Sequence, residues 1–218
     1  MDWFSKKSYP KFWEDYTSKF KNSEENLEAI RFIVFDTETT GLDPKTDRIL
    51  SIGCIAIVHL KIRVSDQFEY YLEQEHFNSE TVKIHGLLKE GKLNKVEEEN
   101  AIIEFLNYVE NSVLVAHHAA FDIAMINNAL KRMELPKLKN KSLDTGHLFN
   151  KTKLDTSKAH FSLDELAERF KIPLHDRHTA SGDAYITALL FLKLVFILNK
   201  NGSLKLKDLL KPKRRGLL

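Results

Sequence analysis

One apolar segment that ends in two carboxylates decides the expected fold of this chain: Phe32-Ile33-Val34-Phe35-Asp36-Thr37-Glu38-Thr39-Thr40-Gly41-Leu42. A run of Phe, Ile and Val predicts a strand that is buried on both faces. Side chains repeat every two residues along a strand, so Asp36 and Glu38 are expected on one face. Two neighbouring acids at the end of a buried strand raise each other's pKa unless a cation neutralises them. Such oxygen ligands suit magnesium or manganese. By itself, the segment also fits an edge strand that runs into a solvated acidic turn.

The segments that follow this strand predict an α/β sandwich. Further strands are expected at residues 49–58, 66–72, 113–116 and 142–144. Helices are expected at residues 100–110, 121–133, 163–170 and 183–198. Ser162 and Glu165 form a capping box at the start of one of them. Three consecutive strands followed by alternating helices and strands are typical of a mixed sheet flanked by helices.

The two ends of the chain differ from this central part, which predicts an N-terminal helical extension at 1–30, a main domain at 31–199 and a basic tail at 200–218. Aromatic residues recur at the spacing of one helical face at Tyr9, Phe12, Trp13, Tyr16 and Phe20. Such a face either packs against the chain's own core or docks another protein. The basic tail is either a solvated terminus or a weak contact to a phosphate backbone.

Composition limits the class of protein. The 218 residues are 43% hydrophobic, which is enough for one sizeable core. The net charge of +2 is too small to indicate nucleic acid by itself. A single cysteine, Cys54, cannot form an intrachain disulfide and suits a reducing cytoplasm. No signal peptide is expected at the start, and the apolar residues 186–198, interrupted by Lys193, predict a buried helix rather than a membrane span.

Three further residues have chemistry that complements Asp36 and Glu38. Asp122 follows the predicted strand at 113–116, at the start of a helix, where ligands gather in α/β sheets. Asp183 opens the last long helix, and His178 precedes it on a loop. A histidine with its usual pKa near 6.5 is suited to take up a proton at neutral pH. Each acid alone is also typical of a helix N-terminus. Together, four carboxylates suit two divalent cations about 4 Å apart.

Three motifs carry a resemblance to a known family: residues 35–42, Ala116-His117-His118-Ala119-Ala120-Phe121-Asp122 and Arg177-His178-Thr179-Ala180-Ser181-Gly182-Asp183-Ala184. They resemble the three exonuclease motifs of the DEDDh (DnaQ-like) family, which includes the proofreading epsilon subunit of bacterial DNA polymerase III. The resemblance extends over about residues 31–199. It implies a ribonuclease H-like fold with a five-stranded mixed sheet, and release of nucleoside 5′-monophosphates from the 3′ end of a strand.

The resemblance also implies roles for individual residues. Asp36, Glu38, Asp122 and Asp183 would bind two Mg²⁺ or Mn²⁺ ions, and His178 would be the general base. Substrate contacts would come from Thr37, Thr39, Gly41, Leu42, Glu80, His85, His118 and Phe121. The chain departs from the family at His118, where an asparagine is usual. An imidazole replaces one hydrogen bond of an amide but not both, so substrate alignment or pH dependence is expected to differ there.

The form of the first motif favours DNA as the substrate, with a single-stranded or frayed 3′ end and a DNA polymerase subunit as candidate partners. The alternatives are a 3′-5′ exoribonuclease of the oligoribonuclease or RNase T type, and a catalytically silent module that binds nucleic acid or supports a polymerase. The presence of all four carboxylates and His178 favours an enzyme.

Overall fold

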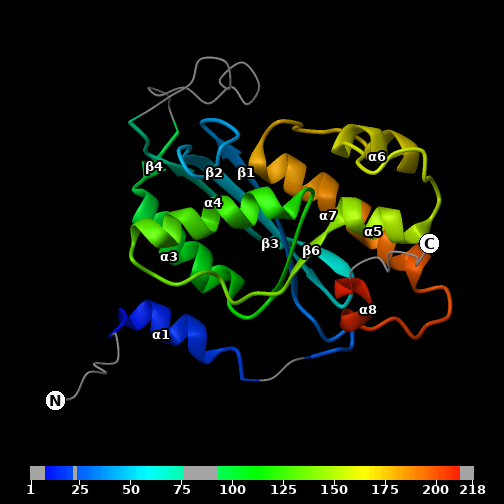
Figure 1. Ribbon diagram of the computed structural model, residues 1–218, viewed down its shortest axis with the longest axis horizontal. Coiled ribbons are helices and arrows are strands. Elements are labelled where there is room, and N and C mark those ends of the chain that lie inside the picture. Colours follow the sequence, from blue (N-terminus) through cyan, green and yellow to red (C-terminus); the bar gives the residue numbers. More distant parts are fainter. Residues whose placement is uncertain (1–7, 22–23, 76–92, 212–218) are drawn as a thin grey trace, which may run out of the picture.

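The computed structural model describes residues 8–21, 24–75 and 93–211. Within these ranges the chain forms one six-stranded sheet of order β4-β3-β2-β1-β5-β6, flanked by helices (Figure 1). The strands are β1 (Phe32–Thr39), β2 (Ile49–Val58), β3 (Lys61–Leu72), β4 (Lys95–Val96), β5 (Val113–Ala116) and β6 (Ser142–Asp144). The helices are α1 (Lys11–Ser18), α3 (Glu98–Val109), α4 (Ala119–Arg132), α5 (Thr145–Thr152), α6 (Leu163–Phe170), α7 (Ala180–Leu198) and α8 (Leu206–Leu210).

The sheet is mixed, as the sequence predicts. β1 runs antiparallel to β2 and parallel to β5, so the carboxyl ends of β1 and β5 lie at the same edge. The expected strand count of five is one too low, because β4 adds a short parallel pairing to β3. A two-residue strand is too short to show the alternation by which strands are recognised in a sequence.

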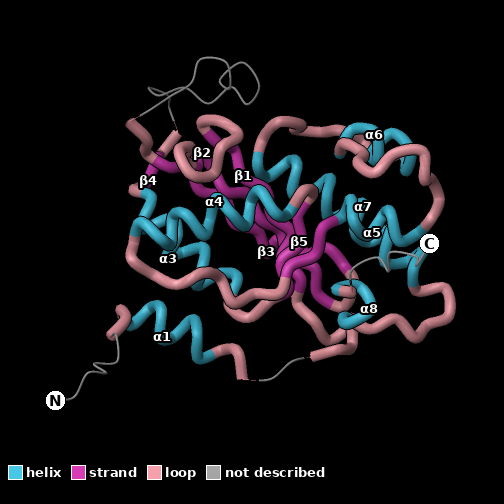
Figure 2. The backbone as a smooth tube through the Cα atoms, in the orientation of Figure 1, coloured by secondary structure: helices cyan, strands magenta, loops and turns pink. Residues whose placement is uncertain are grey.

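β1 lies at the centre of the molecule because both of its faces are buried. Phe32 and Val34 join one apolar cluster, which α5, α6, α7 and α8 cover. Ile33 and Phe35 join the other, which α1, α3 and α4 cover. Figure 2 shows the sheet enclosed between these two groups of helices. The result is a three-layer α/β fold whose central strand delivers Asp36 and Glu38 to one edge of the sheet.

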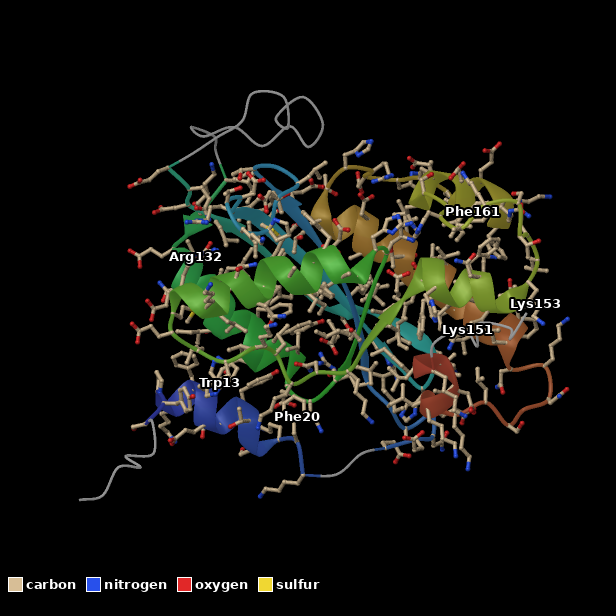
Figure 3. All side chains as sticks on the ribbon, viewed as in Figure 1. Trp13, Phe20, Arg132, Lys151, Lys153 and Phe161 are labelled. Atoms are coloured by element: carbon tan, nitrogen blue, oxygen red, sulfur yellow. The ribbon has the colours of Figure 1, made fainter. Side chains whose placement is uncertain are left out.

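The aromatic face of α1 packs against the chain's own core, which confirms the first of the two interpretations. Trp13 and Tyr16 are each only 3% exposed, and α1 lies against α3 (Figure 3). The Tyr16 hydroxyl donates a 2.6 Å hydrogen bond to Asn140 Oδ1 and accepts one from the Lys139 amide. The helix therefore closes one side of the core.

The start of the C-terminal segment is folded rather than solvated. Leu206 and Leu209, spaced as neighbours on a helix, are each 1% exposed on α8. Lys151 Nζ donates to the carbonyl oxygens of Asp208 and Leu209 at the end of that helix. Residues 212–218 lie outside the described residues. The domain boundaries at residues 30 and 199 stay a prediction.

Helix α7 is long and apolar enough, by length and composition alone, to cross a membrane. It packs against β1 and β2, and residues such as Ile186, Leu190 and Phe191 are fully buried in the core. This position agrees with the expected buried helix.

Candidate active site

Asp36 and Glu38 come from the end of β1 and point to the same face, as the period of the strand predicts. Both are partly buried, and Thr37 between them is buried on the opposite side. In the pairing of β1 with β2, Asp36 lies opposite Gly53. The backbone irregularity between Glu38 and Thr39 ends this regular pairing just beyond the two acids.

Asp183 reaches these two acids because Gly53 allows α7 to approach the sheet. A Cβ atom on Gly53 would lie 2.2 Å from the Ser181 amide nitrogen, which is impossible without a backbone shift. The helix begins with Thr179 as its N-cap, whose Oγ1 accepts a 3.1 Å hydrogen bond from the Gly182 amide. The first turn of α7 therefore packs against β2 beside Asp36. Asp183 belongs to this turn, and its carboxylate comes close to those of Asp36 and Glu38.

Asp36, Glu38 and Asp183 form one cluster whose candidate ligand oxygens all lie within 4.8 Å of one another. Asp183 is 5% exposed, and its Oδ1 is buried with no hydrogen-bond partner among the described residues. A buried, unpaired carboxylate oxygen has a large desolvation cost that a cation offsets. Three oxygen donors of this kind fit a divalent magnesium or manganese ion.

The electrostatics of this cluster also favour a bound cation. Burial, followed by the charges of Asp122, Asp183 and Glu38, raises the pKa of Asp36 well above its usual value. Burial and the Asp183 charge raise the pKa of Glu38 to about 7, and burial raises the pKa of Asp183 as well. Crowded carboxylates of this kind are neutralised by protons or by a metal ion.

Asp122 lies near this cluster but is held differently. Its Oδ1 accepts two hydrogen bonds from Thr37, one from the amide at 3.1 Å and one from the hydroxyl at 2.8 Å. Burial nevertheless raises the pKa of Asp122 to about 7. The four predicted metal ligands thus divide into a tight group of three and a fourth carboxylate that is anchored to β1.

His178 lies on the loop before α7 and is exposed. Its neighbour Arg177 makes an ion pair with Asp183 and a second with Asp164 of α6. The imidazole is therefore accessible to solvent, while the residue before it contacts a member of the acidic cluster.

The predicted substrate contacts have different surroundings. Thr37 and Thr39 are buried, Gly41 and Phe121 are partly buried, and Leu42 is 87% exposed. His118 is exposed at the N-cap of α4, with its ring 4.4 Å from that of His117. Glu80 and His85 lie outside the described residues.

His117 has a structural part in this arrangement. Its Nε2 donates to the carbonyl oxygen of Phe161 at 3.0 Å, and its Nδ1 accepts from the Thr145 hydroxyl at 2.8 Å. Burial lowers its pKa to about 4, so the ring stays neutral at physiological pH. It ties the end of β5 to α5 and to the segment before α6.

Three residues that are not among the predicted site residues also build the site: Gly53, Asp144 and Arg177. Asp144 accepts hydrogen bonds from the amides of Ala119 and His147, so one side chain caps the starts of α4 and α5. This places α4, and with it Asp122. Arg177 stands beside His178 in the third motif, which is the signal that could have directed attention to it.

Comparison with known proteins places this geometry in a family. The model of the RNase_T family, described as an exonuclease, matches residues 33–191. DNA polymerase III subunit epsilon of Rickettsia prowazekii is 33% identical over 173 residues, which cover 77% of this chain and 75% of that protein. The chain belongs to the RNase_T exonuclease family and to its DnaQ-like group, as the three motifs indicated.

A second kind of relative is much longer than this chain. DNA polymerase III PolC-type of Thermotoga petrophila is 31% identical over 194 residues, which cover 89% of this chain but 13% of that protein. The chain therefore spans only a small part of the curated PolC-type relatives that it matches.

Solved structures share the fold. E. coli Exonuclease I, crystallised with a dT13 oligonucleotide, superposes with a TM-score of 0.67 at 16% identity, covering 79% of this chain and 42% of that one. Exonuclease X, in a complex with 5′ overhanging duplex DNA, gives a TM-score of 0.58 at 23% identity, covering 80% of this chain and 92% of that one. The expected ribonuclease H-like fold is thereby confirmed.

Proposed function

We propose that this chain is a divalent-metal-dependent 3′-5′ exonuclease that releases nucleoside 5′-monophosphates from the 3′ end of DNA. The observation that carries the proposal is the cluster of Asp36, Glu38 and Asp183, with its raised pKa values and an unpartnered Asp183 oxygen. Membership in an exonuclease family supports the reaction class.

In the proposed site, Asp36, Glu38 and Asp183 would hold one cation, and Asp36 with the nearby Asp122 would hold a second. Bound Mg²⁺ or Mn²⁺ would lower the pKa of the attacking water and stabilise the departing 3′ oxygen. His178 would accept a proton from the attacking water, and its exposed position on the loop leaves room for this role. Thr37 fixes Asp122 through its amide and hydroxyl.

The substrate is expected to enter from the side of the exposed Leu42. Leu42 and the backbone of residues 37–41 would contact the terminal nucleotide, and His118 and Phe121 at the start of α4 would contact the strand. An exposed leucine is suited to pack against a base, because every base has an apolar face. Thr39, whose hydroxyl donates to the Gly41 carbonyl at 2.7 Å, shapes this turn.

DNA is favoured as the substrate, and replication or repair in the cytoplasm as the setting. Relatives named as DNA polymerase III subunits support this choice, as do structural neighbours that were crystallised with DNA. A polymerase subunit is the proposed protein partner. The alternatives are an exoribonuclease with the same cluster and a silent nucleic-acid-binding module.

The test is a time course with end-labelled single-stranded DNA, single-stranded RNA and a 3′-mismatched duplex, each in Mg²⁺ or Mn²⁺ and in EDTA. We expect stepwise loss from the 3′ end of DNA that requires metal and disappears in Asp36→Ala. Faster degradation of short RNA would favour the exoribonuclease instead. Tight binding to single strands without cleavage in either metal would reject the enzyme and favour the silent module.

A further inference from the structure

Arg177 joins three groups that belong to different parts of the fold. Its Nε and Nη2 donate to the two carboxylate oxygens of Asp164 on α6, at 2.7 and 3.3 Å. Its Nη1 makes an ion pair with Oδ2 of Asp183 on α7. The same nitrogen lies 3.4 Å from Nδ1 of His178. Because a guanidinium only donates hydrogen bonds, each of these partners accepts.

The loop that carries Arg177 adopts a backbone that needs support. Asp176 and His178, on either side of it, have φ angles of 52° and 66°, in the left-handed region that is unfavourable for residues other than glycine. The loop also lies directly on α7, since a Cβ atom on Gly182 would be 2.0 Å from the Asp176 carbonyl oxygen. Unfavourable backbone conformations of this kind persist where the surroundings hold them in place.

The position of Arg177 also matters for the acidic cluster. Its positive charge acts on Asp36, Glu38 and Asp183, lowering the pKa of each against the effect of burial. The side chain is 22% exposed, so this charge is only partly screened by water. At the same time the ion pair engages only Oδ2 of Asp183, while Oδ1 has no partner among the residues described.

We propose that Arg177 is a positioning residue, held by Asp164, that fixes the loop bearing His178 beside the acidic cluster, while its ion pair engages Oδ2 of Asp183 and leaves Oδ1 without a partner among the described residues. This inference rests on the proposed exonuclease function. It assigns to Asp164, which lies outside the three motifs, a part in the geometry of the site. Asp164 acts on the reaction only through Arg177.

The first measurement is steady-state turnover of single-stranded DNA by Arg177→Ala, Asp164→Ala and the double variant. We expect kcat of Arg177→Ala to fall by up to about 100-fold with KM nearly unchanged, because misplacement of reacting groups by about 1 Å has an effect of that size. Asp164→Ala should lower kcat by a smaller factor, and the double variant should be no slower than Arg177→Ala. Wild-type kcat in Arg177→Ala, or effects of the two substitutions that multiply, would overturn the proposal.

The second measurement is Mn²⁺ affinity without DNA, by isothermal titration calorimetry. Removal of a positive charge beside the cluster should make Arg177→Ala bind Mn²⁺ several-fold more tightly, although its turnover is slower. Arg177→Lys keeps the charge but not the two-pronged contact with Asp164. It should therefore keep near wild-type Mn²⁺ affinity with reduced kcat. Weaker Mn²⁺ binding in parallel with lost turnover in Arg177→Ala would indicate only loss of structure and would overturn the proposal.

Arg169 supplies a matched control, since it is an arginine on α6, the helix of Asp164, and makes an ion pair with Asp155. Arg169→Ala should retain wild-type kcat and Mn²⁺ affinity in the folded protein. An inactive wild type would reject the exonuclease function, whereas tighter Mn²⁺ binding by Arg177→Ala would still support the orientation of Arg177 toward the cluster. An active wild type with unchanged kcat in Arg177→Ala would reject the positioning role alone.

Discussion

Two regions of this molecule bury side chains with opposite consequences: the acidic cluster of Asp36, Glu38 and Asp183, and the aromatic face of α1. At the acidic cluster, burial raises the pKa values of carboxylates that already repel one another. At the aromatic face, Trp13 and Tyr16 are removed from water, and the Tyr16 hydroxyl keeps hydrogen bonds to Asn140 and Lys139. Burial of apolar surface stabilises the fold, whereas burial of like charges destabilises it.

The comparison indicates where the chain gives up stability. An arrangement of carboxylates that is unfavourable in the protein alone is suited to bind a cation, because the cation removes the repulsion. The aromatic helix α1 packs against α3 and adds buried apolar surface to the core. Substitutions at the cluster and at α1 should therefore have opposite effects on stability.

Replacing Asp36 by Asn should abolish nuclease activity and raise the melting temperature of the metal-free protein at neutral pH, because a neutral amide replaces a buried carboxyl group whose ionised form is disfavoured there. Mn²⁺ should stabilise the wild type but not this variant, since only the wild type binds it well. Calorimetry with and without Mn²⁺, alongside an activity assay, measures both effects. Asp176→Asn, an exposed acid on the neighbouring loop, is the control. A less stable Asp36→Asn protein would contradict the contrast.

Replacing His178 by Ala should lower kcat by about 100- to 10,000-fold, the range expected for loss of a general base. Mn²⁺ affinity and stability should remain near wild type, because the side chain is exposed. His175→Ala, on the same loop and also exposed, should keep wild-type turnover. Single-turnover kinetics compare the two variants, and unchanged turnover in His178→Ala would remove it from the mechanism.

Replacing Trp13 by Ala should lower the free energy of unfolding by about 3–5 kcal/mol, as expected for loss of a large buried aromatic side chain. The kcat of the protein that remains folded should not change. Phe196→Ala serves as a control, because that aromatic side chain is 82% exposed on α7 and its loss should change stability by less than about 0.5 kcal/mol. Urea denaturation measures both; a Trp13→Ala protein as stable as the wild type would show that α1 is dispensable.

Replacing Gly53 by Ala should force the first turn of α7 away from β2 and so displace Asp183 from Asp36. We expect a loss of about 1–3 kcal/mol in stability, typical of an overfilled core, together with weaker Mn²⁺ binding. Gly146→Ala is a milder control, since its nearest contact would be the Asp144 side-chain oxygen at 3.2 Å. Equal Mn²⁺ affinity in Gly53→Ala and wild type would show that the close approach of α7 to β2 at Gly53 does not determine the geometry of the acidic cluster.

The pH dependence of stability should reflect Glu38. Its pKa rises from 4.5 to about 7 in the folded protein, so between these values the folded state binds a proton that the unfolded chain has released. Its stabilising contribution is therefore complete below about pH 4.5 and is lost as the pH rises through about 7. Denaturation of metal-free wild type and Glu38→Gln at several pH values measures the difference between their free energies of unfolding. The wild type should lose stability relative to Glu38→Gln as the pH rises. A constant difference would contradict the raised pKa.

Much of this site follows from local sequence patterns. The apolar run of β1 predicts a strand, and the period of a strand puts Asp36 and Glu38 on one face. The capping box at Ser162 and Glu165 marks the start of α6 where the structure has it. Helix boundaries were less well predicted, since α7 begins at Ala180 rather than Asp183 and α5 was not anticipated. The short α5 depends on a cap by Asp144, a contact that is weak as a sequence signal.

The residue types of the site, their order and the strand that presents two of them can be predicted from the sequence alone, because they depend on side-chain chemistry and on a period of two residues. Which of the acids lie together depends on the tertiary structure. Asp183 lies beside Asp36 and Glu38 because Gly53, which is far from it in the chain, lets α7 pack against β2. Asp122 instead accepts a hydrogen bond from the Thr37 hydroxyl. The tertiary structure also brings Arg177 and Asp164 together at the site. Such contacts depend on how closely two backbones approach, and that distance is set by packing across the whole core rather than by any local pattern.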